Sequence, residues 1–159
     1  MGAGLPYAIG AKIANNDKMV ILIDGDSSFN MTLTDLKTIA EHKLPIKICI
    51  MNNDSQMMVT IWEKLFFNER YTATINEKNP SFTKLAESYG LKSLYCDNVN
   101  NLEETIHEFI SYPDSILCEF KIDKGICLPL VGPGKALDDM ILHENYHSNI
   151  KIKDGLAPS

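Results

Sequence analysis

The hydrophobic and polar positions of the chain predict buried strands that alternate with helices. Residues 20–28 and 46–53 are short apolar runs rich in β-branched side chains, and each ends abruptly in small or oxygen-bearing residues. Such a run is typical of a buried parallel strand whose carboxyl end opens onto a site. Two further strands are predicted at residues 91–96 and 115–122.

Helical periodicity occupies most of the segments between these runs. Helices are predicted within residues 1–14, 31–42, 54–67, 82–89 and 102–110, with a short helix at 135–142. The polar segment 68–80 is predicted to cross the surface without regular structure. The alternation of strands and helices predicts an α/β fold, a doubly wound and mostly parallel sheet with helices on both faces.

Composition narrows the class of protein. A chain of 159 residues suits one domain, and folding at this size buries about 70% of the unfolded surface. The net charge of −6 comes without a basic stripe, so we expect no nucleic-acid partner. No apolar run reaches membrane-spanning length, and the first residues lack the features of a signal or transit peptide, so neither a membrane partner nor a targeting segment within this chain is expected.

Two strand ends carry the candidate chemistry. A right-handed crossover places the carboxyl ends of the first two strands at one edge of the sheet, so Asp26 and Asn53 could face one ion. One carboxylate and one amide oxygen suit Mg²⁺, which keeps few protein ligands and completes its shell with phosphate and water. The simpler alternative is that Asp26 caps the following turn and Asn53 forms an Asx turn.

Three other motifs suggest different chemistry. Asp24 and Asp26 after an apolar strand are compatible with the nucleophile loop of an Asp-dependent phosphatase, but a convincing downstream lysine is lacking. His143 and His147 fit the spacing of a zinc protease, although only 12 residues follow and none is a further His or Glu. The early glycines do not have dinucleotide-loop spacing, because the third stands at Gly10 and no strand precedes them.

The strand-end motif also resembles a known family. Gly25-Asp26-Ser27, answered by Asn52-Asn53, is similar to the thiamin-diphosphate motif that begins Gly-Asp-Gly and ends Asn-Asn. Further matching stretches are residues 25–34, 58–62, 66–71, 128–131 and 137–138. Together they resemble the catalytic subunit of acetolactate synthase, especially the fungal type, from Met1 to about Leu142.

The resemblance implies a role for each matching residue. Asp26 and Asn53 would be side-chain ligands of Mg²⁺, and the carbonyl of Ser55 would be a third ligand. The full set of cofactor-binding residues would be Met1, Gly25, Asp26, Ser27, Ser28, Asn53, Ser55, Gln56, Met57 and Met58. Within that set, Ser27, Ser28, Gln56 and Met57 would line the diphosphate, Met1 would support the bent cofactor, and Met58 would lie beside the aminopyrimidine ring.

The resemblance also implies residues of a substrate pocket, and the chain differs from the family at several positions. Val59 and Trp62 would border the pocket, and Trp62 would favour the larger second keto acid. The family usually has Gly at Met57 and Gln at Ile61, so Met57 could crowd the diphosphate and Ile61 removes a polar group near Trp62. The family also differs at Ser27 and Ser55, but Ser55 contributes only its carbonyl.

The same resemblance implies the organisation of the enzyme. Residues 1–124 would form a thiamin-diphosphate- and Mg²⁺-binding α/β domain, incomplete at its N-terminus, and residues 125–159 the lid loop and tail of that domain. The glutamate that activates the cofactor would come from a pyrimidine-binding domain, in cis or from another subunit, so no catalytic residue is expected on this chain. FAD would be bound mainly elsewhere in the complete enzyme.

The implied activity is the decarboxylation of pyruvate and its condensation with a second 2-keto acid, such as 2-ketobutyrate, in branched-chain amino-acid biosynthesis. The complete enzyme would be a homodimer or larger, with a possible regulatory subunit, in the mitochondrial matrix if fungal and otherwise in the cytoplasm or a plastid. The alternative left open is a non-catalytic domain that binds the cofactor and needs a partner for turnover.

Overall fold

The computed structural model describes residues 1–125 and 128–142, which fall into two compact units. The first, called the sheet unit, comprises Met1–Ser55 and Asn76–Asp123. The second, called the helix–hairpin unit, comprises Gln56–Ile75 and Lys124–Ser159, of which 124–125 and 128–142 are described. The chain therefore leaves the sheet unit after Ser55 and returns to it at Asn76.

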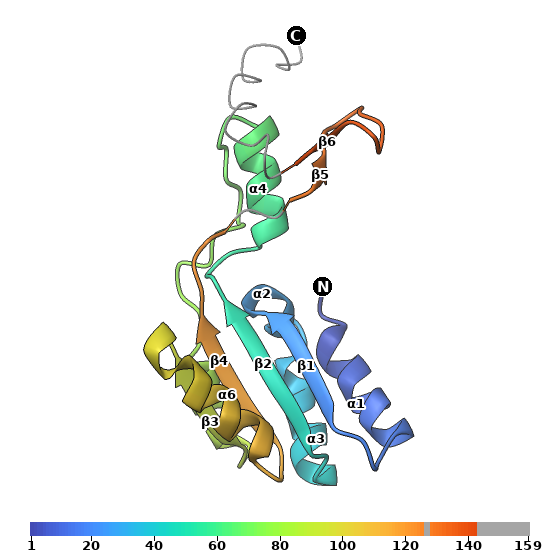
Figure 1. Ribbon diagram of the computed structural model, residues 1–159, viewed down its shortest axis with the longest axis vertical. Coiled ribbons are helices and arrows are strands. Elements are labelled where there is room, and N and C mark those ends of the chain that lie inside the picture. Colours follow the sequence, from blue (N-terminus) through green and yellow to red (C-terminus); the bar gives the residue numbers. More distant parts are fainter. Residues whose placement is uncertain (126–127, 143–159) are drawn as a thin grey trace. The chain divides into compact units, whose positions relative to one another are not determined.

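Four parallel strands form the sheet of the sheet unit. They are β1 (Val20–Gly25), β2 (Ile46–Asn52), β3 (Lys92–Cys96) and β4 (Ile116–Lys121), in the order β1-β2-β4-β3 (Figure 1). Because β1 and β2 are parallel, their carboxyl ends meet at one edge, where Gly25 is paired with Met51. The parallel sheet confirms the predicted fold class.

Helices cover both faces of this sheet. Those of the sheet unit are α1 (Gly4–Ala14), α2 (Asp26–Phe29), η1 (Leu33–Asp35), α3 (Leu36–His42), α5 (Phe82–Ser88), η2 (Val99–Asn101) and α6 (Leu102–Ser111). Successive residues of β2 divide between two clusters: Ile48 and Ile50 pack with α1, α3 and α5, whereas Cys49 packs with α6. Burial on both faces explains why β2 and β4 are mostly apolar, although Lys47 and Glu119 are also buried.

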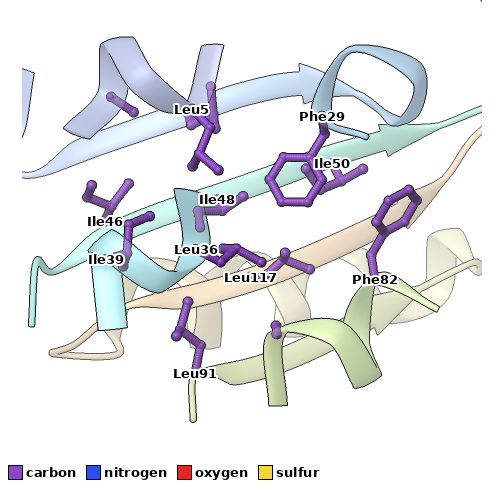
Figure 2. Packing of buried hydrophobic residues seen from close by; sticks show 13 residues of the cluster. Leu5, Phe29, Leu36, Ile39, Ile46, Ile48, Ile50, Phe82, Leu91 and Leu117 are labelled. Atoms are coloured by element: carbon purple, nitrogen blue, oxygen red, sulfur yellow. The ribbon is translucent and has the colours of Figure 1, made fainter. Parts of the chain in front are cut away.

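The larger core cluster lies between the sheet and the helices α1, α2, α3 and α5 (Figure 2). Two fully buried aromatic rings, those of Phe29 and Phe82, meet edge to face, with centroids 5.7 Å apart and an interplanar angle of 76°. This pair joins the turn after β1 to the start of α5. Packing in the core therefore fixes two segments that also carry polar side chains at the edge of the sheet.

The smaller cluster contains three free, buried thiols, those of Cys49, Cys96 and Cys118. Burial, and after it the neighbouring thiols and carboxylates, raises the pKa of Cys118 from its ordinary value of 9.0 to about 12. The thiol is therefore protonated in the folded protein at a pH where the unfolded chain has begun to lose that proton. Cys118 behaves as a small apolar core residue.

We expect this shift to make the folded protein less stable in alkali. A raised pKa in the folded state contributes stability that is complete below about pH 9 and is lost as the pH rises towards about 12. Urea denaturation from neutral to alkaline pH should therefore show a shallower decline of the unfolding free energy for Cys118→Ala than for the unaltered chain. If the unfolding free energy declined equally with pH in the two proteins, the raised pKa of Cys118 would be contradicted.

The helix–hairpin unit contains helix α4 (Met57–Phe66) and a short antiparallel pair, β5 (Leu130–Val131) and β6 (Met140–Ile141). The predicted helix over residues 135–142 is wrong, because those residues turn and then pair as β6. Gly134 has a φ of +70°, and Asp139 N–H donates to the carbonyl of Ala136. These turns connect the two strands.

Two other predicted helices have different bounds in the structure. The predicted helix at 31–42 is divided, because the regular helix α3 begins only at Leu36, after the single 3₁₀ turn η1. The helix predicted from residue 54 begins at Met57, since Asp54 has a φ of +53°. The amides that directly follow Asn53 therefore belong to a loop and not to a helix N-terminus.

Candidate functional site

The carboxylate of Asp26 lies at the end of β1, as the first residue of the short helix α2. It is 1% exposed, and its Oδ2 accepts hydrogen bonds from Asn76 Nδ2 at 2.8 Å and from Asn79 Nδ2 at 2.7 Å. These donors are side-chain amides, so Asp26 does not serve as a simple backbone cap of the turn. A buried carboxylate held by charge-assisted hydrogen bonds is a preorganised anionic group.

The loop after β2 lies at the neighbouring strand end. Asn53 Oδ1 accepts from the N–H of Ser55 at 3.1 Å, and Asn52 Oδ1 accepts from the N–H of Asp54 at 3.0 Å. These are Asx turns, as the simpler alternative for Asn53 predicts. A carbonyl-type oxygen has two lone pairs, so the Asx turn still leaves Asn53 Oδ1 able to bind a cation.

Serine hydroxyls and the start of the chain complete this edge of the sheet unit. Ser28 Oγ accepts from the N–H of Gly2 at 2.9 Å, and Ser27 Oγ accepts from Asn76 Nδ2 at 2.7 Å. A Cβ on Gly4 would stand 2.6 Å from Asp24 Oδ2, so glycine permits α1 to approach the end of β1 closely. Met1, 66% exposed, precedes this contact.

The donor set fits a hard divalent cation better than a soft one. Among residues 1–125 and 128–142, no group of three or more His, Cys, Asp or Glu side chains is placed to hold a metal. Asp26, Asn53 and the Ser55 carbonyl instead supply one carboxylate, one amide oxygen and one backbone oxygen, a set that suits Mg²⁺ with phosphate completing its shell. Asp24 Oδ2 has no hydrogen-bond partner among residues 1–125 and 128–142, and its burial disfavours it as a phosphatase nucleophile.

The helix–hairpin unit has an apolar pocket of about 660 Å³ against α4. Its lining comprises Met58, Val59, Trp62, Glu63, Phe67, Arg70 and Thr72. The Trp62 ring meets Phe66 edge to face at 5.2 Å. Glu63 accepts from the N–H of Thr72 at 2.9 Å and from Thr74 Oγ1 at 2.5 Å, so its carboxylate fastens the returning loop to the helix.

The predicted site residues are thus divided between the two units. Those in the sheet unit are Met1, Gly25, Asp26, Ser27, Ser28, Asn53 and Ser55, and those in the helix–hairpin unit are Gln56, Met57, Met58, Val59 and Trp62. Ile61 is buried on α4 and is not among the residues that line the pocket. His143 and His147 lie outside the described residues.

Sequence reasoning missed the two asparagines that hold Asp26. Asn76 and Asn79 belong to the segment predicted as a polar surface crossing, and the sequence signal was only a pair of asparagines three residues apart before Pro80. It also missed Lys121, which forms an ion pair with Asp54 at the end of β4. These residues come from distant parts of the chain, so local patterns do not connect them to the strand ends.

Comparisons with known proteins identify the family of the chain. Residues 1–120 match the family model described as thiamine pyrophosphate enzyme, C-terminal TPP binding domain. The chain is 46% identical over 142 residues to the mitochondrial acetolactate synthase catalytic subunit of Saccharomyces cerevisiae, covering 89% of this chain and 20% of that protein.

Relatives from other lineages have similar sequence identities to this chain. The acetolactate synthase large subunit of Porphyra purpurea is 43% identical over 143 residues, and the probable acetolactate synthase large subunit of Methanococcus aeolicus is 41% identical over 152 residues. These matches cover 89% and 96% of this chain, but only 24% and 25% of those proteins. The chain thus spans about a fifth to a quarter of the length of these relatives. Among the described helices, none is long and apolar enough to cross a membrane.

Proposed function

Since the chain belongs to the family of C-terminal TPP-binding domains of thiamine pyrophosphate enzymes, we propose that it anchors the Mg²⁺-diphosphate half of thiamin diphosphate in an acetolactate synthase. The observation that carries the proposal is the buried carboxylate of Asp26 at the end of β1, beside the strand β2 that leads into the Asn53–Ser55 loop. In this proposal Asp26, Asn53 and the Ser55 carbonyl hold Mg²⁺.

The remaining residues divide between the two ends of the cofactor. Gly25, Ser27, Ser28, Gln56 and Met57 would line the diphosphate, while Met1 would support the cofactor and Met58 would lie beside its aminopyrimidine ring. The exposed side chains of Met58 and Val59, together with Trp62, border the apolar pocket and support its use for a 2-keto acid. An apolar lining with a few polar groups is typical of a small-molecule pocket.

When bound, thiamin diphosphate supplies the electron sink for loss of CO₂ from pyruvate. This chain's contribution is to bind and orient: fixed oxygen ligands restrict the diphosphate, and orientation of a reactive group lowers the entropic part of a barrier. The chain supplies no activating glutamate in this proposal. Turnover therefore needs a pyrimidine-binding domain, in cis or from another subunit, and the isolated 159 residues bind the cofactor without product formation.

The wider assembly is proposed by the same reasoning. The reaction is the transfer of a two-carbon unit from pyruvate, after loss of CO₂, to a second 2-keto acid, and its products lead to isoleucine and valine. The complete enzyme is a homodimer or larger, holds FAD outside this chain and has a possible regulatory subunit. The acetolactate synthases of the fungal relatives are mitochondrial by name, which supports a mitochondrial location.

Calorimetric titration of the 159-residue chain with thiamin diphosphate tests this function. We expect binding with Mg²⁺ present and its loss when a chelator removes the metal, because Asp26 and Asn53 would hold the ion that neutralises the diphosphate. In the same preparation, pyruvate, Mg²⁺ and FAD should yield acetolactate only after a complementing N-terminal region is added. Metal-independent binding would refute the proposed anchoring through Mg²⁺. Acetolactate formed by the chain alone would refute the proposal that another domain activates the cofactor.

A further inference from the structure

Asn79 occupies a central place in the hydrogen-bond network at the carboxyl edge of the sheet. Its Nδ2 lies 2.7 Å from Asp26 Oδ2, 3.0 Å from Asp54 Oδ1 and 3.3 Å from Asn52 Oδ1. Its own Oδ1 accepts a hydrogen bond from Asn30 Nδ2 at 3.1 Å. One amide group therefore contacts both the end of β1 and the loop that follows β2.

The contact to Asp54 bears directly on the proposed metal ligands. Asp54 stands between Asn53 and Ser55, and its backbone is in the left-handed region. Its carboxylate is held on two sides, by Asn79 at Oδ1 and by Lys121 at Oδ2. Because Asp54 is fixed in this way, the oxygens that its two neighbours offer to a cation are fixed with it.

The segment that carries Asn79 is itself anchored at both ends. The N–H of Asn76 donates to the carbonyl of Asp54 at 2.9 Å, and the fully buried Phe82 holds the start of α5 in the core. Ser81 caps that helix by accepting from the N–H of Lys84. Asn79 is therefore presented from a backbone whose position is set by other contacts.

The charges explain why an amide suits this position. Asp26 and Asp54 are both anionic, so a neutral group that donates to both offsets their repulsion without adding a third charge. The side-chain amides of Asn76 and Asn79 both donate to Oδ2 of Asp26. Asp26 is thus restrained through Oδ2, and in the proposed site Oδ1 would be the oxygen that binds the cation.

We propose that Asn79 is a positioning residue for the divalent cation, which sets the Asp26 carboxylate and the Asn53–Ser55 loop at the separation that the ion requires. The inference rests on the proposed function and assigns a residue outside the Gly-Asp and Asn-Asn motifs. Asn76 also donates to Asp26, but its second side-chain contact is Ser27 and not Asp54. The effect of Asn79 on the cation should therefore exceed that of Asn76.

Mn²⁺ provides a spectroscopic probe of this arrangement. We would titrate the 159-residue chain with Mn²⁺ in the presence of thiamin diphosphate and follow free and bound ion by electron paramagnetic resonance. Asn79→Ala should weaken Mn²⁺ binding by roughly 10- to 100-fold, the usual effect of removing a residue that orients a metal ligand. It should also broaden the spectrum of the ion that remains bound, whereas Asn76→Ala should cause a smaller loss.

Controls separate positioning from folding. Asn100→Ala makes the same chemical change at an exposed site in η2 and should leave Mn²⁺ binding unaltered. Denaturant unfolding of each variant gives its folded fraction. If Asn79→Ala does not fold, Asn79→Ser replaces it, because a serine hydroxyl is too short to bridge both carboxylates. Equal Mn²⁺ affinity and spectra for the Asn79 variants and the unaltered chain would refute the role of Asn79 alone. Failure of the unaltered chain to bind Mn²⁺ with thiamin diphosphate would refute both this inference and the proposed function.

Discussion

Asp26→Ala is expected to weaken the Mg²⁺-dependent binding of thiamin diphosphate by more than about 100-fold. The variant removes a proposed ligand itself, so its effect should exceed the roughly 10- to 100-fold typical of residues that only support a ligand. The amides of Asn76 and Asn79 also lose their shared acceptor, at a cost of about 1–3 kcal/mol in folding free energy. Calorimetric titration at saturating Mg²⁺ measures the first effect and denaturant unfolding the second.

Two further variants separate charge from shape in this experiment. Asp26→Asn keeps the size of the side chain but removes its charge, and it should lose most of the affinity as well. Asp17→Ala removes an exposed carboxylate in the turn before β1 and should leave affinity unaltered. Unchanged affinity of a folded Asp26→Ala protein would remove Asp26 from the metal site.

Phe82→Ala should destabilise the sheet unit by about 3–5 kcal/mol, as expected when a fully buried phenylalanine is truncated and leaves a cavity. Small domains have a total stability of about 5–15 kcal/mol, so this variant approaches the limit of folding. Phe82 also stands three residues after Asn79, and its ring contacts Phe29 at the end of α2, the helix that begins with Asp26. Cofactor affinity should therefore fall together with stability.

A double-mutant cycle tests whether the contact between Phe29 and Phe82 contributes to the loss of stability. Combining Phe82→Ala with Phe29→Ala should reveal a coupling of about 0.5–1.5 kcal/mol for the edge-to-face pair. Phe67→Ala makes the same truncation at a side chain that is 45% exposed and should change stability by no more than about 0.5 kcal/mol. A small effect of Phe82→Ala in urea unfolding would mean that α5 does not depend on this contact.

Local patterns were sufficient to predict the sheet and the strand-end residues. The apolar runs at β1 and β2 ended in Asp26 and Asn53, and parallel pairing brought those strand ends to one edge as expected. Patterns failed where backbone conformation overrode composition. Asp54 adopts a left-handed conformation that delays α4, and the turn at Gly134 replaces the expected helix by a strand.

The supporting residues of the site could not be found in this way. Asn79 lies 53 residues from Asp26 and 25 from Asp54, in a segment without periodicity, so its contacts depend on the tertiary fold. The same holds for Lys121, whose partner lies 67 residues away. Sequence motifs identify groups that contact a cofactor more readily than groups that hold those contacts in place.

Trp62 is the only tryptophan in the chain, and it belongs to the helix–hairpin unit. Fluorescence excited at wavelengths that tyrosine does not absorb therefore reports on that unit alone. Tyrosines of the sheet unit, such as Tyr89 and Tyr112, do not contribute to this emission. Far-ultraviolet circular dichroism, in contrast, reports mainly on the larger sheet unit with its four strands. Comparison of the two signals during denaturation gives an intrinsic, label-free measure of whether the two units unfold in a single cooperative step.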